Sequence, residues 1–287
     1  MASLKEVKIR INSIKSTRKT TSAMKMVASA KLHKAQGVFG NMLPYSIALH
    51  HVMEALLSSE FSSPLCDKRP VEKVAVVALS SDSSLCGAFN SNIIRETQKN
   101  LEQYRNLPKE NVQIYTIGKK VYDALRKNGF SITKNFVNLA DKPNYDTIAE
   151  LAGSLIRQFE KKEIDRVEIL YHHFKSAGIQ ILMNESILPL VLPQPNNIAK
   201  INTDYILEPS REALLNILIP KSIKLQFYTS LLDSNCSEHA ARMVAMQIAT
   251  DNADDLVNEL TIIYNKTRQQ VITNELLDIV GGQQKRS

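Results

Sequence analysis

Hydrophobic residues recur every three or four positions over a long stretch at the start of the chain. This spacing predicts one helix from about Leu4 to Ser58 that packs along one side. Gly37, Gly40 and Pro44 are expected to weaken or bend the helix without ending it. The predicted seam consists of Leu4, Val7, Ile11, Ile14, Thr21, Ala28, Leu32, Ala35, Phe39 and Met42, with Arg18 and Lys25 as polar interruptions, and it resumes as Ile47, Val52, Met53, Leu56 and Leu57.

A second stretch with the same spacing closes the chain. It runs from Lys221 to Val280 without glycine or proline, and a single helix of that length would measure about 90 Å. Ser210 is the expected N-cap, Pro220 is expected to kink the helix, and the pair at 281–282 is expected to end it. The predicted seam is Leu225, Tyr228, Leu232, Met243, Met246, Leu256, Leu260 and Ile263.

Both helical stretches carry a segment rich in methionine and alanine, at 23–30 and 240–246. Small residues let two backbones approach closely, and methionine fills irregular gaps. We therefore expect an antiparallel pair with Met24 level with about Met243. In that register the second helix continues unpaired beyond roughly residue 265, for about 20 Å.

In the middle of the chain, predicted strands alternate with predicted helices, which indicates an α/β layer whose first strands are mostly parallel. A loop is expected from Ser58 to Arg69. The predicted strands are 74–79, 112–117, a short one at 130–133, and a pair at 167–174 and 179–185; the predicted helices run to about 104, to 127, and from 144 to 162, and a last extended piece is expected at 204–208. The predicted domains are thus 1–58, 59–209 and 210–287.

Charge changes this picture at one place only. The formal net charge is +7, and the first 34 residues hold nine lysines and arginines against the single acid Glu6. This local basicity implies a partner with an acidic surface. A nucleic-acid arm is one interpretation, but the stretch has almost no aromatic residues to stack on bases. A basic, serine-rich start is also typical of an organellar transit peptide, although the regular apolar spacing argues against a discarded leader.

Few residues suggest chemistry. The loop Ser80–Gly87 follows a strand and precedes a helix, where phosphates often bind, yet it lacks the glycines and lysine of a phosphate-binding loop. A tight turn or a protein contact is the favoured interpretation. His172 and His173 should point to opposite faces of a strand, and His50 and His51 to diverging sides of a helix. The three cysteines are widely spaced, which indicates free thiols. No catalytic set, metal site or membrane span is predicted.

Four segments together resemble the gamma subunit of the rotary F-type ATP synthase. They are the opening helix at 14–28, the loop at 81–87, the segment at 204–209, and above all 237–252 with Tyr264 to Gln269, Ile272-Thr273 and Glu275-Leu276. The resemblance covers the whole chain. It implies α/β plus coiled coil: long antiparallel N- and C-terminal helices that form a shaft, with an inserted Rossmann-like α/β domain as a foot.

The resemblance also implies a function. Such a chain is the central rotor shaft of a proton-translocating ATP synthase, couples ion-driven rotation of a membrane c-ring to sequential changes at the catalytic beta subunits, and is itself non-catalytic. Its expected partners are the alpha, beta and epsilon subunits and the c-ring, with one copy per complex, no cofactor and no nucleic acid. The implied contacts with beta are Arg268, Gln269, Met24, Arg242 and Asp82; those of an apolar bearing are Leu276, Leu277, Ile279 and Val280; those of the foot with the rotor ring and epsilon are Tyr205 and Glu208.

The sequence departs from the family at Ser83 and Ser84, where a basic residue and a glycine are common, and at Pro220. Starting directly with the first helix favours the cytoplasmic face of a bacterial inner membrane over the matrix side of a mitochondrial one. The alternative function is a static coiled-coil tether with an α/β head, which predicts partners in symmetric stoichiometry.

Overall fold

A computed structural model describes residues 3–56, 63–190, 207, 208 and 210–284. The chain divides into two compact units, which we call the helical unit (Met1–Ala28 with Arg242–Ser287) and the sheet unit (Ser29–Ala241). Two helices belong to both units: α1, Leu4–Leu56, and α5, Arg211–Gln284. The two long helices inferred from the hydrophobic spacing are therefore confirmed. The predicted domain bounds stay a prediction, because the division into units cuts both helices.

The expected breaks in the long helices have less effect than their sequence suggests. α1 continues through Gly37, Gly40 and Pro44, and α5 continues through Pro220. The predicted stop after Val280 is wrong, because α5 runs on to Gln284. Each glycine costs a helix only about 1 kcal/mol, so a glycine pair need not end it. At the start of α5, Ser210 is the N-cap, and its Oγ accepts a hydrogen bond from the backbone N–H of Ala213 at 3.2 Å.

The sheet unit is built on five strands in the order β3-β2-β1-β4-β5. The first four are parallel, and β5 runs antiparallel to β4. Their bounds are Val74–Leu79 for β1, Val112–Ile117 for β2, Lys134–Phe136 for β3, Arg166–Ser176 for β4 and Ile179–Leu188 for β5. The predicted parallel α/β layer, closed by a strand pair, is confirmed.

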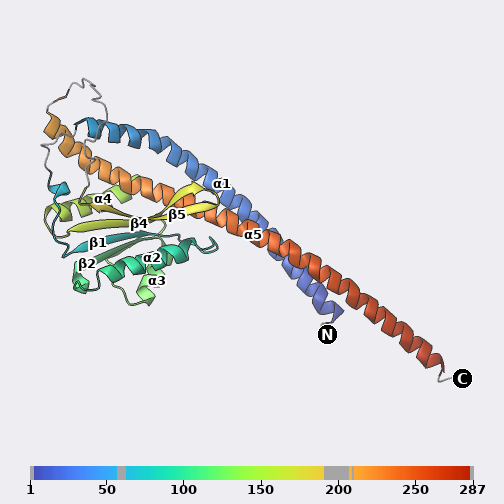
Figure 1. The fold of residues 1–287 in the computed structure, drawn as a ribbon. Helices are drawn as coiled ribbons and strands as arrows, with labels where there is room; N and C mark the ends of the chain where they lie inside the picture. Colours follow the sequence, from blue (N-terminus) through green and yellow to red (C-terminus); the bar gives the residue numbers. More distant parts are fainter. Residues whose placement is uncertain (1–2, 57–62, 191–206, 209, 285–287) are drawn as a thin grey trace. The chain divides into compact units, whose positions relative to one another are not determined.

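Helices cover both faces of this sheet (Figure 1). One face packs against α2, Phe89–Gln103, and α3, Lys119–Lys127, and the other packs against α4, Tyr145–Glu160, and α5. β1 lies at the centre and is buried throughout. Because side chains alternate along a strand, Ala75 and Val77 belong to one core and Val74 and Val76 to the other.

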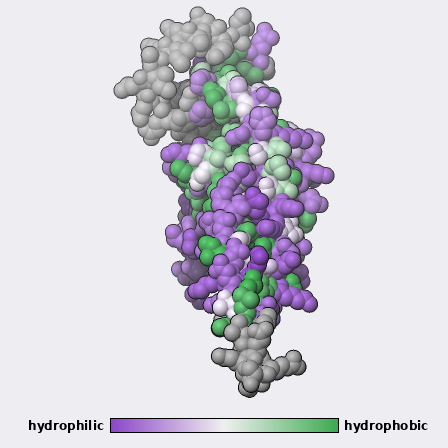
Figure 2. All heavy atoms as spheres, turned by 90° about the vertical axis from the view of Figure 1, so that its right-hand side faces the viewer, coloured by the Kyte–Doolittle hydropathy of each residue, from purple (hydrophilic) through white to green (hydrophobic). Residues whose placement is uncertain are grey.

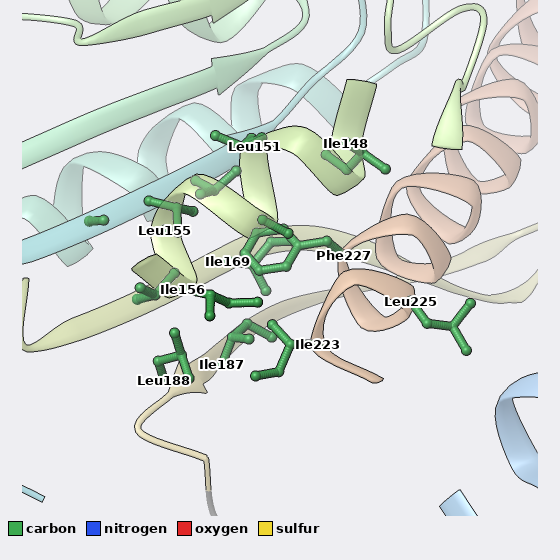
Figure 3. Packing of buried hydrophobic residues seen from close by; sticks show 14 of the residues in the cluster. Ile148, Leu151, Leu155, Ile156, Ile169, Ile187, Leu188, Ile223, Leu225 and Phe227 are labelled. Atoms are coloured by element: carbon green, nitrogen blue, oxygen red, sulfur yellow. The ribbon is translucent and has the colours of Figure 1, made fainter. Parts of the chain in front are cut away.

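The larger core lies where α5 packs on the sheet. Phe227 of α5 is fully buried and points toward Leu155 of α4 and Ile169 of β4 (Figure 3). Ile223, one turn earlier on α5, lies beside Ile187 of β5 in the same view. This core also includes Leu49, Met53 and Leu56 of α1, so α1, α4 and α5 share one apolar interior with the strands.

Two local predictions are wrong. The third strand lies at Lys134–Phe136, not at 130–133, because the backbone N–H of Phe130 folds back to cap α3 at the carbonyl of Leu125. Ile47 was placed on the buried seam of α1, but it is exposed, and Leu49 takes that position.

Candidate functional site

In the helical unit, two polar contacts join α1 to α5. The hydroxyls of Thr21 and Thr250 lie 2.8 Å apart, and Arg18 Nε lies 2.5 Å from Asp254 Oδ1. These pairs fix an antiparallel register, as the sequence predicts. The predicted register, with Met24 level with Met243, is wrong by about one helical turn. By the observed pairs, the first residue of α1 is level with about Arg268 of α5.

Small and apolar side chains fill the seam between the two helices. Ala28 and Ala253 are buried, as are Val7 and Ile11. Because alanine has no side chain beyond its Cβ, such residues allow two helix backbones to approach closely. Met24, one of the residues implied to contact beta, is half-buried here, and so is Arg242, which makes an interaction within the described structure.

The outward face of α5 carries large apolar side chains. Ile262 is 70% exposed, and Leu256 and Ile263 are also exposed. The prediction that Leu256 and Ile263 belong to the seam is therefore wrong, since Ala253 and the half-buried Leu260 take that side. Figure 2 shows that apolar groups on the viewed face are interspersed among hydrophilic ones.

Residues 268–277 of α5, which we call the exposed end, have no cover in the described part of the chain. Every side chain in this range is exposed, including the apolar Leu276 at 58% and Leu277 at 63%. Arg268 and Gln269 are exposed too, and within the described residues neither of these two side chains makes a hydrogen bond or ion pair. A helix with both apolar and polar groups open to water on all sides presents a surface for a surrounding partner.

Other predicted contact residues lie partly outside the described structure. Tyr205 falls outside the described residues, and so do the side chains of Ile279 and Val280, although both belong to α5. Glu208 is described and exposed. The roles of these residues stay predictions.

The loop Ser80–Gly87 of the sheet unit is bonded to the start of α3. The first three backbone N–H groups of that helix are all used. Lys119 donates to Asp82 Oδ1 at 3.0 Å, Lys120 to the carbonyl of Ser81 at 3.1 Å, and Val121 to Ser80 Oγ at 3.0 Å. A phosphate would need these same N–H groups. The structure therefore favours the predicted tight turn over a nucleotide site here.

Glycine is required where this loop meets the next strand. Gly118 has φ of 97°, and a Cβ at this position would lie 2.2 Å from the carbonyl oxygen of Ser80. Asp82 turns its carboxylate toward α3. Ser83, Ser84 and Leu85 are the next residues of the loop, and all three are exposed. The predicted contact of Asp82 with beta stays a prediction.

The histidine pairs show no metal chemistry. His172 is 2% exposed and stacks on Phe89 with ring centroids 4.3 Å apart, and burial lowers its pKa to about 4. His173 is half-exposed on the opposite face, as predicted, and its Nδ1 lies 2.6 Å from Asp233 Oδ2. No group of histidine, cysteine, aspartate and glutamate within the described residues is arranged to hold a metal ion.

Three further observations bear on the predictions. Cys66, Cys86 and Cys236 are free, as predicted, and burial raises the pKa of Cys236 to about 12. Among the described residues, no helix is both long and apolar enough to cross a membrane. His50 and His51 are both exposed on α1.

Comparisons with known proteins decide the family. The ATP synthase family profile matches residues 3–284. The ATP synthase gamma chain of Bacteroides fragilis is 55% identical, over 98% of this chain and 99% of the relative, and that of Flavobacterium psychrophilum is 43% identical over 98% of both. The chain belongs to the ATP synthase gamma chain family. Its function is that of an ATP synthase gamma subunit, as the resemblance predicts.

Solved structures confirm the fold of this gamma chain. A chain in the mitochondrial ATP synthase of Euglena gracilis, in an assembly described as OSCP, F1 and c-ring in rotational state 3, has a TM-score of 0.68 at 22% identity; the match covers 98% of this chain and 93% of that one. A chain from the rotor of the same enzyme has a TM-score of 0.64 at 20% identity, covering 94% and 98%. At these identities the likeness supports the fold alone.

Sequence reasoning missed a set of buried polar residues on α5. Asp233, Asn235 and Ser237 were not singled out, yet all three are buried and hydrogen-bonded. One signal was available, because the sequence contains no lysine or arginine between Lys224 and Arg242. Exposed faces of helices usually carry lysine or arginine, so a helical segment that lacks both over this length is expected to be buried.

Proposed function

We propose that the exposed end of α5 turns inside a ring of alpha and beta subunits. In this proposal Arg268 and Gln269 form hydrogen bonds with a beta subunit in one rotational position, and Leu276 and Leu277, with Ile279 and Val280, sit in an apolar bearing. The observation that carries the proposal is the exposure of every side chain from 268 to 277. Water alone gives such a helix no packing energy, whereas an enclosing ring does.

The paired part of the helices supplies stiffness in this proposal. A shaft must transmit rotation without unwinding, and two helices in contact resist bending and twisting better than one. The seam of Val7, Ile11, Ala28 and Ala253 holds α1 against α5. Met24 and Arg242, near the end of that seam, are the further proposed contacts with beta, together with Asp82 on the sheet unit.

A single helix inside a threefold ring is necessarily asymmetric. At any moment its arginine faces one beta subunit and not the other two, so the three catalytic sites are held in different states. Ion flow through a membrane c-ring would turn the sheet unit, which we propose rests on that ring and on an epsilon subunit through Tyr205 and Glu208. The catalytic chemistry belongs to beta, and one gamma chain serves each complex at the membrane surface. The relatives are bacterial, which supports the cytoplasmic face of the inner membrane.

The contact residues are tested by Arg268→Ala with Gln269→Ala in the assembled complex. Charge-assisted hydrogen bonds are the strong ones, so losing this pair should slow ATP synthesis about tenfold while the amount of assembled complex stays the same. The measurement is ion-driven ATP synthesis in membrane vesicles, normalised to the complex present.

The matched control is Lys266→Ala, which removes a cation from an exposed position two residues earlier. Synthesis should be close to normal in this variant. Unchanged synthesis in the double variant, or an equal loss in Lys266→Ala, contradicts the proposed contact. Counting chains in the purified complex tests the rest, because a symmetric stoichiometry of gamma to beta would favour the static tether.

A further inference from the structure

One segment of α5, residues 230–240, is buried on every side, and we call it the grip segment. Surface helices bury one stripe and expose the rest, so a helix surrounded through three turns is unusual. Its interior is not simply apolar. Seven buried residues of the segment are polar or charged: Ser230, Asp233, Ser234, Asn235, Ser237, Glu238 and His239.

Two of these residues bond to strand β4. Asp233 Oδ1 accepts a hydrogen bond from the backbone N–H of Phe174 at 2.7 Å, and its Oδ2 lies 2.6 Å from His173 Nδ1. Ser237 donates its hydroxyl to the carbonyl of His172 at 3.0 Å. Asp233 and Ser237 are one helical turn apart, so they lie on the same side of α5. That side is fixed to the backbone of the strand.

Asn235 makes a hydrogen bond on the opposite side of α5. Two residues along a helix correspond to a rotation of about 200°, so Asn235 lies opposite Asp233. Its Nδ2 donates to the carbonyl of Ala140 at 2.6 Å, in the loop that precedes α4. The next residue of the loop, Asp141, forms an ion pair with Lys31 of α1 at 2.6 Å, and this hydrogen bond lowers the pKa of Asp141.

We infer that Asp233, Asn235 and Ser237 are the positioning residues that pass torque between the β-sheet with its loop at Ala140 and α5. Hydrogen bonds on opposite sides of a helix oppose rotation about its axis better than bonds on one side alone, because bonds on one side still allow the helix to pivot about them. Those to backbone atoms of β4 and of the loop also resist sliding, because those atoms are fixed by the sheet. The inference rests on the proposed function, since it concerns a shaft that turns with its foot.

Slippage of α5 at the grip segment should change the ratio of ions pumped to ATP hydrolysed, whereas a loss of folded complex should lower both rates alike. If α5 turns without the β-sheet, ATP hydrolysis continues but no longer drives ion pumping. Asn235→Ala with Ser237→Ala removes one bond on each side of the helix. We expect the ratio of ions pumped to ATP hydrolysed to fall about fivefold or more in vesicles that carry the assembled complex.

The matched control is Asn100→Ala with Tyr104→Phe. Asn100 of α2 and Tyr104, the residue just after that helix, donate hydrogen bonds to Glu168 of β4, each at 2.6 Å. The control therefore also removes two bonds to β4 but leaves α5 untouched. Its pumping and hydrolysis should fall together, if they fall at all, with an unchanged ratio.

The outcomes separate the possibilities. An unchanged ratio in the Asn235 and Ser237 variant, or an equal fall in the α2 control, overturns the inference. If the double variant does not assemble, Ser237→Ala alone, a nearly isosteric change, should lower the ratio of ions pumped to ATP hydrolysed by a smaller factor. The proposed function fails separately, if complexes that lack this chain still pump ions when they hydrolyse ATP.

Discussion

Two regions of α5 show how differently one helix can be used. In the grip segment every side chain is buried, and polar groups are bonded to the sheet and to a loop. In the exposed end every side chain, apolar or polar, is open to water in the described structure. Both regions are regular helix. The backbone is therefore the same, and the side chains decide which region is fixed within the chain and which is free to meet a partner.

The largest expected effect comes from a substitution in the buried part of α5. Phe227→Ala removes a fully buried ring from the core shared by α4, α5 and the sheet, and we expect it to lower the free energy of unfolding by about 3–5 kcal/mol. Leu276→Ala at the exposed end should change it by less than about 0.5 kcal/mol. Urea unfolding of the full chain measures both, and equal losses would show that the two regions are not distinct.

A change of pH tests the stability of the buried region and should have a smaller effect on the free energy of unfolding. Burial lowers the pKa of His172 from 6.5 to about 4. Below pH 6.5 the unfolded chain therefore binds a proton that the folded chain does not, and stability is lost as the pH falls toward 4. Between pH 7 and pH 5 this amounts to about 2 kcal/mol. His172→Phe should flatten the pH dependence of urea unfolding. An unchanged slope in His172→Phe excludes this histidine as the cause.

The smallest effect is expected between the paired helices. Arg18 and Asp254 are close to half-exposed, with side-chain exposures of 49% and 44%. Water and salt screen such a pair, so its coupling energy should be below about 1 kcal/mol. A double-mutant cycle with Arg18→Ala and Asp254→Ala measures this energy. A value above about 2 kcal/mol would mean that this contact resembles the grip segment more than the exposed end.

The parts that sequence predicted best are those where burial repeats at short range. Val74 to Leu79 is a continuous apolar run, and it forms the central strand with the predicted bounds. The spacing of Val7, Ile11, Ala28 and Leu32 predicts α1 and its buried side, because each turn repeats the same environment.

The parts that failed depend on distant neighbours. Leu256 and Ile263 have helical spacing just as Ala253 and Leu260 do, and periodicity cannot say which of two such faces meets α1. Phe130 is of a residue type that is common in strands, but its backbone N–H caps α3. Asp233 and Ser237 bond to backbone atoms of β4, and a main-chain partner leaves no pattern in the sequence.

The carboxylate of Asp82 at the start of α3 has a consequence for an ATP synthase subunit. A phosphate held at a helix start comes and goes with its concentration, whereas a side chain of the same polypeptide stays in place. Asp82, with Ser80 and Ser81, already occupies the amides that a nucleotide would seek. At this corner of the sheet unit, the turn keeps its shape through bonds within the chain, and the start of α3 offers no free amide through which ATP or ADP would act on it.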